Sequence, residues 1–149
     1  MTQSASLPLE MVKMKKILVP ILLAIGLAAC ASSGNQTSAL ERAQYAYSAA
    51  IRWGDLDGAW SQLAPELRAR GEMSEIERNR WKQIQITSYR VLSSEATADG
   101  GAVRMIEIGV ANRHTMSERQ LRYQEVWRWD VASKTWFLTS GLPDLWGGQ

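Results

Sequence analysis

The sequence predicts an α+β fold, in which N-terminal helices pack on a curved antiparallel sheet of four or more strands. Two observations support this prediction. Up to Lys82 the apolar residues recur with a period of about 3.6, and after Lys82 the period changes to about 2. The expected strands then follow one another without helices between them, which favours an antiparallel meander over a β-α-β arrangement.

The first helix is predicted from a capping signal and an apolar stripe. Ser38 and Glu41 form a Ser-x-x-Glu capping box, which predicts that the helix and the folded domain begin at Ser38. Gly54 ends the apolar pattern. The side chains expected to face the core are Leu40, Ala43, Tyr47, Ala50 and Ile51.

Shorter helices are expected between this helix and the sheet. Asp55 or Asp57 is the predicted N-cap of the next helix, and Pro65 allows one further short turn. Ser74 and Glu77 form a second capping box ahead of another helix. The larger apolar residues of these segments are Leu56, Trp60, Leu63, Ile76 and Trp81.

Four segments rich in β-branched and aromatic residues are expected to form the sheet, and they cover residues 84–92, 103–110, 121–129 and 136–139. Asp99 and Gly100 indicate a hairpin between the first two. On the second segment Ile106, Ile108 and Val110 should face the core, which leaves Glu107 outside.

Alternation along the third segment places a carboxylate on the apolar face. Side chains two residues apart share a face of a strand, so Glu125 should point with Tyr123 and Trp127. An unpaired buried charge is costly, so Glu125 needs a partner. The candidate pocket therefore comprises Glu125 with Tyr47, Tyr89, Arg90, Tyr123 and Trp127. Either a buried structural contact or a general acid or base would explain this carboxylate.

The remaining polar residues indicate no catalytic or metal site. The single histidine, His114, falls in a polar loop and is interpreted as a surface residue. No metal-ligand spacing, phosphate loop or catalytic triad is present in the sequence, so no cofactor is expected. Most of the seven tryptophans should fill the core, with Trp146 as the exception. A stacking platform for sugars or for a partner's aromatic residues is the alternative.

The N-terminal residues have the layout of an export signal. Lys13, Lys15 and Lys16 precede an uncharged apolar run over residues 17–27. This run is shorter than the ~20 residues of a membrane-spanning helix. The true start is Met1, Met11 or Met14. The predicted domains are a signal peptide over 1–29, a lipidated cysteine and flexible tether over 30–37, and one folded domain over 38–149.

The end of the apolar run resembles the bacterial lipobox. It consists of Leu27, Ala28, Ala29 and Cys30, the single cysteine of the chain. The resemblance implies that the Cys30 thiol carries a diacylglycerol and that its amine is acylated, for example with palmitate. Ala31, where retained inner-membrane lipoproteins often carry Asp, implies the periplasmic face of the outer membrane.

The charge of the expected mature chain excludes one class of partner. The full chain has 17 basic and 15 acidic side chains, and removal of three lysines and Glu10 leaves 14 of each. Nucleic-acid binding depends on an excess of basic groups, so no nucleic-acid partner is expected.

The stretch YAYSAAIRWGDLDGAWSQLAPELR, residues 45–68, is similar to the opening of the nuclear transport factor 2-like (cystatin-like) superfamily. The resemblance covers residues 38 to about 142 and implies a cone-like α+β roll with a pocket at its open end. Some members of that superfamily are isomerases, dehydratases or epoxide hydrolases, and many only bind or pair. The fold therefore does not decide the function.

Three functions remain open on the sequence. The first is a lipid-anchored, non-catalytic binding or assembly module of the cell envelope, held to the membrane through Cys30. The second is a small envelope enzyme that uses Glu125 as acid or base, and the third is a structural homodimer. The sequence names no ligand or protein partner.

Overall fold

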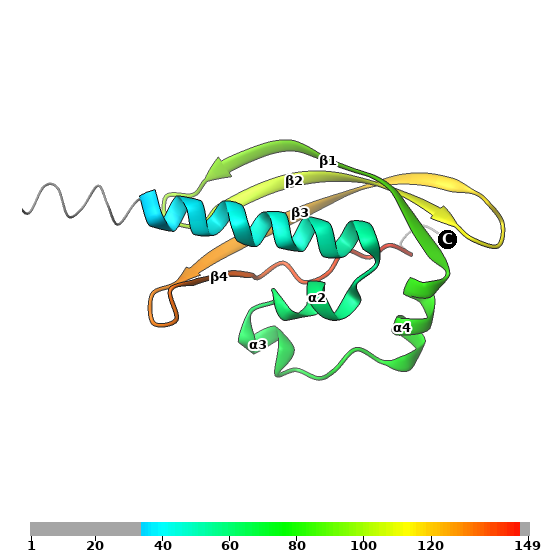
Figure 1. The fold of residues 1–149 in the computed structure, drawn as a ribbon, viewed down its shortest axis with the longest axis horizontal. Helices are drawn as coiled ribbons and strands as arrows, with labels where there is room; N and C mark the ends of the chain where they lie inside the picture. The colour runs from blue at the N-terminus through cyan, green and yellow to red at the C-terminus, as the bar shows by residue number, and fades with distance from the viewer. Residues whose placement is uncertain (1–33, 147–149) are drawn as a thin grey trace, which may run out of the picture. The chain divides into compact units, whose positions relative to one another are not determined.

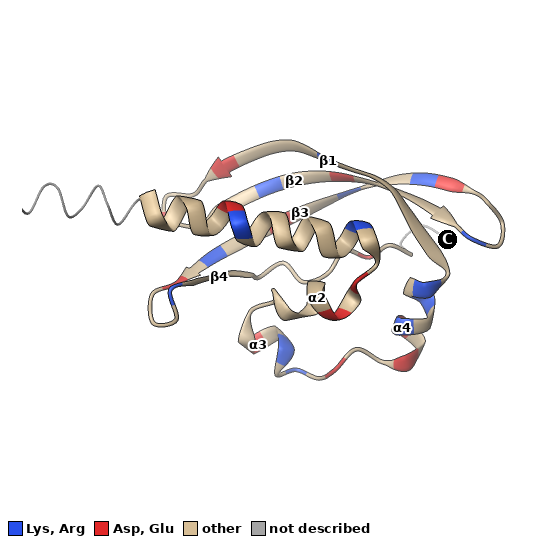
Figure 2. Ribbon diagram, viewed as in Figure 1, with Lys and Arg blue, Asp and Glu red and all other residues tan. Residues whose placement is uncertain are grey.

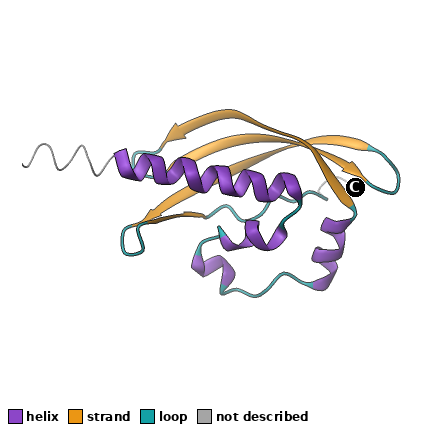
Figure 3. Ribbon diagram, in the orientation of Figure 1, coloured by secondary structure: helices purple, strands orange, loops and turns teal. Residues whose placement is uncertain are grey.

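A computed structural model describes residues 34–146 of the chain. The chain divides into two units, Met1–Ser38 and Ala39–Gln149. The second unit has the predicted α+β architecture, with helices that precede a four-stranded antiparallel sheet (Figures 1 and 3). The expected signal peptide and the lipobox residues Leu27, Ala28, Ala29 and Cys30 lie outside the described residues.

The first described element is a helix over residues 34–53. Residues 34–37 are already helical, so the prediction of a flexible tether there and of a helix start at Ser38 is wrong. Extending a helix adds one hydrogen bond for each residue fixed, so an internal Ser-x-x-Glu pair does not force a start. Gly54 ends the helix with φ 70°, a conformation that glycine adopts without steric cost.

Three short helices follow, and each begins at the signal that the sequence predicts. They are α2 (Leu56–Ser61), α3 (Pro65–Arg68) and α4 (Glu75–Lys82). Asp55 caps α2 by accepting a hydrogen bond of 2.9 Å from the Gly58 amide. Ser74 and Glu77 form the predicted capping box of α4. Figure 2 shows acidic residues at the start of α4 and basic residues at its end, which suits the helix dipole.

The sheet is an antiparallel meander in the order β1-β2-β3-β4. Its strands are β1 (Ile84–Ala96), β2 (Ala102–Asn112), β3 (Glu118–Asp130) and β4 (Thr135–Leu138). One isolated parallel bridge joins Leu63 to Leu138. The Ala64 amide donates to the Leu138 carbonyl over 2.8 Å, and the Leu138 amide donates to the Gln62 carbonyl over 2.8 Å. The residues before α3 therefore pair with the outer edge of β4.

The core lies between the N-terminal helix and the inner face of the sheet. Tyr47 and Ile51 are fully buried, as predicted. Ile106, Ile108 and Val110 are also buried, which confirms the predicted face of β2.

Trp53 does not belong to this core. Its side chain is 87% exposed, and Tyr45, two helical turns earlier, is 76% exposed. Both residues lie on the outer face of the helix, which contradicts the expectation that Trp53 fills the core. The helical period therefore decides the burial of Trp53, whatever its side-chain type.

Candidate functional site

Glu125 lies on the inner face of the sheet and is fully buried. The register of β2 and β3 places it directly opposite Arg104. Oε2 of Glu125 accepts hydrogen bonds from Nε of Arg104 over 2.9 Å and from Nη2 over 2.6 Å. Both nitrogens bond the same oxygen, so the contact is a charge-assisted pair of hydrogen bonds converging on Oε2, and Oε1 receives none from Arg104.

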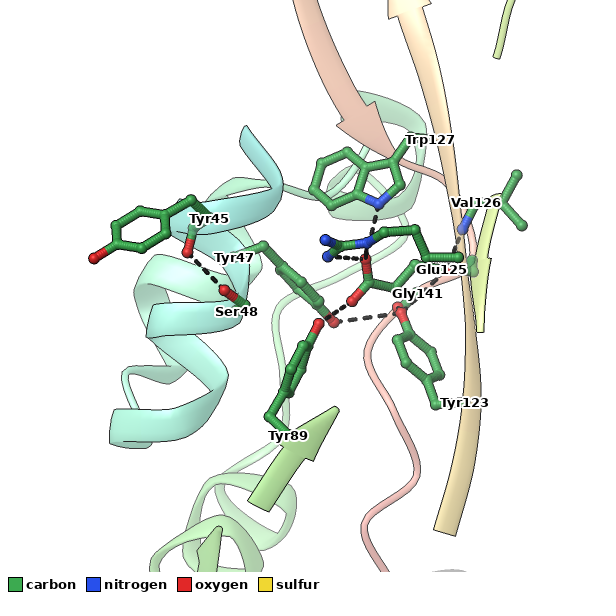
Figure 4. Close-up of polar contacts among 11 residues, drawn as sticks. Tyr45, Tyr47, Ser48, Tyr89, Tyr123, Glu125, Val126, Trp127 and Gly141 are labelled. Carbon is green, nitrogen blue, oxygen red and sulfur yellow. Dashed lines mark hydrogen bonds and ion pairs between the residues drawn. The ribbon is translucent and has the colours of Figure 1, made fainter. Parts of the chain in front are cut away.

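Two aromatic side chains complete the contacts of Glu125. The indole Nε1 of Trp127 donates to Oε2 over 2.9 Å, and the Tyr89 hydroxyl donates to Oε1. Figure 4 shows the Trp127 and Tyr89 side chains pointing at the carboxylate. Three of the four donors converge on Oε2, and one reaches Oε1. Both oxygens of Glu125 are therefore engaged.

Two further tyrosines connect the N-terminal helix to the sheet beside this carboxylate. The hydroxyls of Tyr47 and Tyr123 lie 3.3 Å apart, and the Tyr123 hydroxyl also donates to the Gly141 carbonyl (Figure 4). The Tyr47 ring meets the Trp127 ring edge-on, with 5.8 Å between their centroids. We call Tyr47, Tyr89, Arg104, Tyr123, Glu125 and Trp127 the Glu125 network.

The three tyrosines of the network are hydrogen-bond donors and poor bases. Burial raises the pKa of Tyr47 and of Tyr89, and the charge of nearby Glu125 raises that of Tyr89 further. Burial also raises the pKa of Tyr123 to about 12. Their hydroxyls therefore stay protonated at neutral pH, and the network contains no tyrosinate that could abstract a proton from a substrate.

A β-bulge puts Tyr89 into the network. Ile86 pairs with Val110 and Ser88 with Gly109, so Thr87 has no partner on β2. Strict alternation from Ile86 would turn Tyr89 outward, and the extra residue reverses this and buries it.

Gly109 gives this bulge the space it needs. A Cβ at Gly109 would lie 2.5 Å from the hydroxyl oxygens of both Thr87 and Ser88. A side chain at 109 would require these two hydroxyls to move, so glycine at this position leaves them room beside the bulge.

The same bulge explains why Arg90 is not a partner of Glu125, contrary to the prediction. Arg90 points to the outer face, where it pairs with Glu107. Nε of Arg122 lies 3.7 Å from the other oxygen of Glu107. Glu107 thus lies outside, as predicted, between two arginines of the neighbouring strands.

Arg104 is the functional partner that the sequence analysis misses. It has the same parity on β2 as Ile106 and Ile108, so continuing their alternation towards the N-terminus places it on the core face. A buried arginine directly opposite a buried glutamate is the signal that would have identified the pair. Of the predicted pocket residues, the structure brings together Glu125, Tyr47, Tyr89, Tyr123 and Trp127.

Comparison of the chain with protein-family models, with curated proteins and with solved structures finds no match. Within the described residues 34–146, no helix is long and apolar enough to cross a membrane. The same part of the chain holds no cluster of three or more His, Cys, Asp or Glu side chains that would bind a metal ion. The description of the site therefore rests on the residues of this chain, without a known relative for comparison.

A second candidate site is a cleft of about 480 Å³ between the short helices and the C-terminal segment. Its aromatic lining comes from three separate places, with Trp60 on α2, Trp81 on α4 and Trp146 near the C-terminus. All three are half-buried. The polar side chains of its lining are Arg70, Glu72, Glu77, Arg80 and Asp144. We call this region the tryptophan cleft, and Glu125 is not among its lining residues.

Polar groups of the tryptophan cleft are only partly matched. Arg70 and Arg80 form no ion pair with any residue in the described range. The indole Nε1 of Trp146 is buried and has no acceptor there. Gln44 Nε2 and Arg119 Nε, outside the cleft, are also buried without a partner, so this feature is not particular to the cleft.

Trp146, predicted as the exception among the core-filling tryptophans, is half-buried. Trp146 packs against the core beside Leu145, which is 1% exposed. The Trp146 amide donates to Oδ1 of Asp144 over 3.0 Å, which fixes the local turn. A short segment without periodicity gives no sign of such packing, because tertiary contacts alone decide it.

Proposed function

We propose that the protein is a lipid-anchored, non-catalytic binding module of the bacterial cell envelope, held on the periplasmic face of the outer membrane through Cys30. The basic start, the apolar run and the lipobox-like residues occur in the order that lipoprotein processing requires. Several acyl chains anchor a protein durably, since each buried methylene contributes about 0.8 kcal/mol. The cone-like roll of the nuclear transport factor 2-like superfamily is part of this proposal.

The observation that carries the non-catalytic part is the engagement of both Glu125 oxygens by four donors. A general acid or base must exchange its proton with a substrate that lies within hydrogen-bond reach. Glu125 is fully buried, and each of its oxygens already accepts a hydrogen bond from a protein group, three at Oε2 and one at Oε1. We therefore assign Glu125 to the stability of the fold and place binding at the tryptophan cleft.

A sheet-face homodimer is the less favoured alternative. The middle of the outer face carries Arg90, Glu107 and Arg122, which pair with one another. Stable dimer interfaces have apolar centres that are depleted in charge. A binding module that acts through its cleft needs no such face.

The anchor is tested by Cys30→Ser in cells labelled with a radioactive palmitate. The wild-type protein should carry label and sediment with the outer membrane, because acylation requires the thiol. Cys30→Ser should carry no label and remain as precursor or as soluble protein. A wild-type mature protein that is free in the periplasm without lipid would disprove the anchor.

The same cells test the non-catalytic assignment with Glu125→Gln. This variant should keep its label and its place in the membrane, and it should restore any envelope defect caused by deletion of the protein, although its melting temperature falls. Loss of that restoration at a normal protein level and with an intact fold would favour an enzyme instead.

A further inference from the structure

We propose that the tryptophan cleft binds an uncharged sugar chain. This inference rests on the proposed envelope function and specifies the ligand class of the cleft. At about 480 Å³, the cleft lies within the range of small-ligand sites, about 300–1,000 Å³. Its walls come from α2, from residues 67–73, from α4 and from residues 141–146, so a bound molecule would contact four separate segments of the chain.

The aromatic lining provides surfaces of the right kind for sugar rings. Trp60, Trp81 and Trp146 are half-buried, so each keeps part of its indole accessible while packing fixes the rest. An indole combines a large apolar face with one polar N–H group. A pyranose ring has the complementary pattern, with an apolar C–H face and a rim of hydroxyl groups.

The polar side chains of the cleft favour a ligand without net charge. Arg70 and Arg80 are opposed by Glu72, Glu77 and Asp144, so charges of both signs line the same cleft. A strongly anionic or cationic ligand would meet repulsion from one of these groups. Sugar hydroxyls both donate and accept, and thus match carboxylates and guanidinium groups in one molecule.

The unmatched donors of the cleft also call for acceptors. Among residues 34–146, Nε1 of Trp146 is buried and has no acceptor, and the exposed guanidinium groups of Arg70 and Arg80 form no direct salt bridge. Hydroxyl or acetamido oxygens of a sugar would accept hydrogen bonds from the exposed guanidinium groups of Arg70 and Arg80, whereas Nε1 of Trp146 is shielded from a ligand.

A peptide strand fits the cleft less well. Extended peptides bind most often by adding a strand to a free sheet edge. The edge of β4 near this cleft already pairs with residues 62–64 through the Leu63–Leu138 bridge. Recognition in the cleft must therefore come from side chains, which suits a rigid ring better than a peptide backbone.

The test is a titration of the full-length protein with the β-1,4-linked tetramer of N-acetylglucosamine, in which tryptophan fluorescence reports binding. The protein is kept in a zwitterionic detergent, since a detergent with a sugar headgroup would compete. We expect saturable binding that Trp81→Ala and Arg80→Gln each weaken by about tenfold or more. Trp53→Ala is the matched control, because Trp53 is 87% exposed and lies outside the cleft, and it should leave the affinity unchanged.

Each result of this titration decides the inference. Binding of the unacetylated glucose tetramer with the same variant pattern also supports a sugar site, one that does not recognise the acetamido group. No saturable binding of either tetramer up to about 10 mM overturns the inference. Binding that Trp81→Ala and Arg80→Gln leave unchanged, while near-UV circular dichroism shows intact folds, overturns it as well. Lipidation at Cys30 is measured separately, so an anchored protein that binds no sugar refutes only the ligand class.

Discussion

The Glu125 network and the tryptophan cleft are built from the same kinds of side chain, yet their polar groups differ in how completely they are matched. In the network, two arginine nitrogens, an indole N–H and a tyrosine hydroxyl all contact one buried carboxylate. In the cleft, Arg70, Arg80 and the indole N–H of Trp146 lack such partners among the described residues.

This difference separates a structural cluster from a binding site. A satisfied buried network rigidifies a core and has little left to offer a ligand. Half-exposed aromatic rings beside unpaired polar groups retain free energy of interaction that a ligand can use. Residue type alone favours Glu125 over the tryptophan cleft as the functional site. The hydrogen bonds favour the cleft instead, because those of Glu125 are already made within the protein.

The largest expected effect comes from removing the cation of the network. Arg104→Met should lower the free energy of unfolding by about 3–5 kcal/mol, because it leaves the Glu125 carboxylate buried without its partner. Chemical denaturation measures this loss. The double variant Arg104→Met/Glu125→Leu should recover most of it, since an apolar pair replaces both charges. A loss below about 1 kcal/mol for the single variant would show that Arg104 is not the partner that holds Glu125 in the core.

A smaller effect should follow from filling the space opposite the bulge. Gly109→Ala places a methyl group against the hydroxyls of Thr87 and Ser88, and we expect a loss of about 1–3 kcal/mol. In a Thr87→Ala background the same substitution should cost less, because one of the two contacts is gone. Equal losses in both backgrounds would mean that the bulge does not control this position.

The smallest effect is a pH dependence that appears only in alkali. Burial raises the pKa of Tyr123 to about 12, whereas an unfolded tyrosine titrates near 10. The contribution of Tyr123 is therefore fully present below about pH 10 and is lost as the pH rises towards 12. Between pH 9 and 11.5, the free energy of unfolding of Tyr123→Phe should fall less steeply with pH than that of the wild-type protein. The difference in slope is at most about 1.4 kcal/mol per pH unit.

Tyr45→Phe is the control for this measurement, because Tyr45 is 76% exposed. Its alkaline decline should match that of the wild-type protein. If the free energy of unfolding fell equally steeply with pH for the wild-type protein and Tyr123→Phe, the raised pKa assigned to the buried Tyr123 hydroxyl would be wrong.

Local signals in the sequence predict much of this fold. Ser74 with Glu77 and Asp55 cap their helices as expected, because capping depends only on residues within one turn. The change of apolar period at Lys82 marks the transition to the sheet, and the alternation along β3 places Glu125 inside. Each of these features is decided by neighbours along the chain.

Features that depend on distant residues escape such analysis. The bulge at Thr87 exchanges the faces of Tyr89 and Arg90, and only the pairing with Gly109 reveals it. Trp146 packs against the core, and no periodic pattern in the sequence predicts this packing. The candidate site is therefore predictable in its central carboxylate, whereas its partner Arg104 and the tryptophan cleft require the three-dimensional arrangement.

The bridge between Leu63 and Leu138 has a consequence for crowding. Unpaired strand edges can template pairing between neighbouring molecules, and this risk grows when proteins are confined to a surface at high local concentration. Residues 62–64 shield β4 from such pairing. The exposed far half of β1 carries the polar residues Ser93, Ser94 and Glu95, and also Val91 and Leu92, which are 50% and 46% exposed. If Cys30 carries the proposed lipid anchor, the shielding by residues 62–64 would keep neighbouring copies from pairing along the β4 edge.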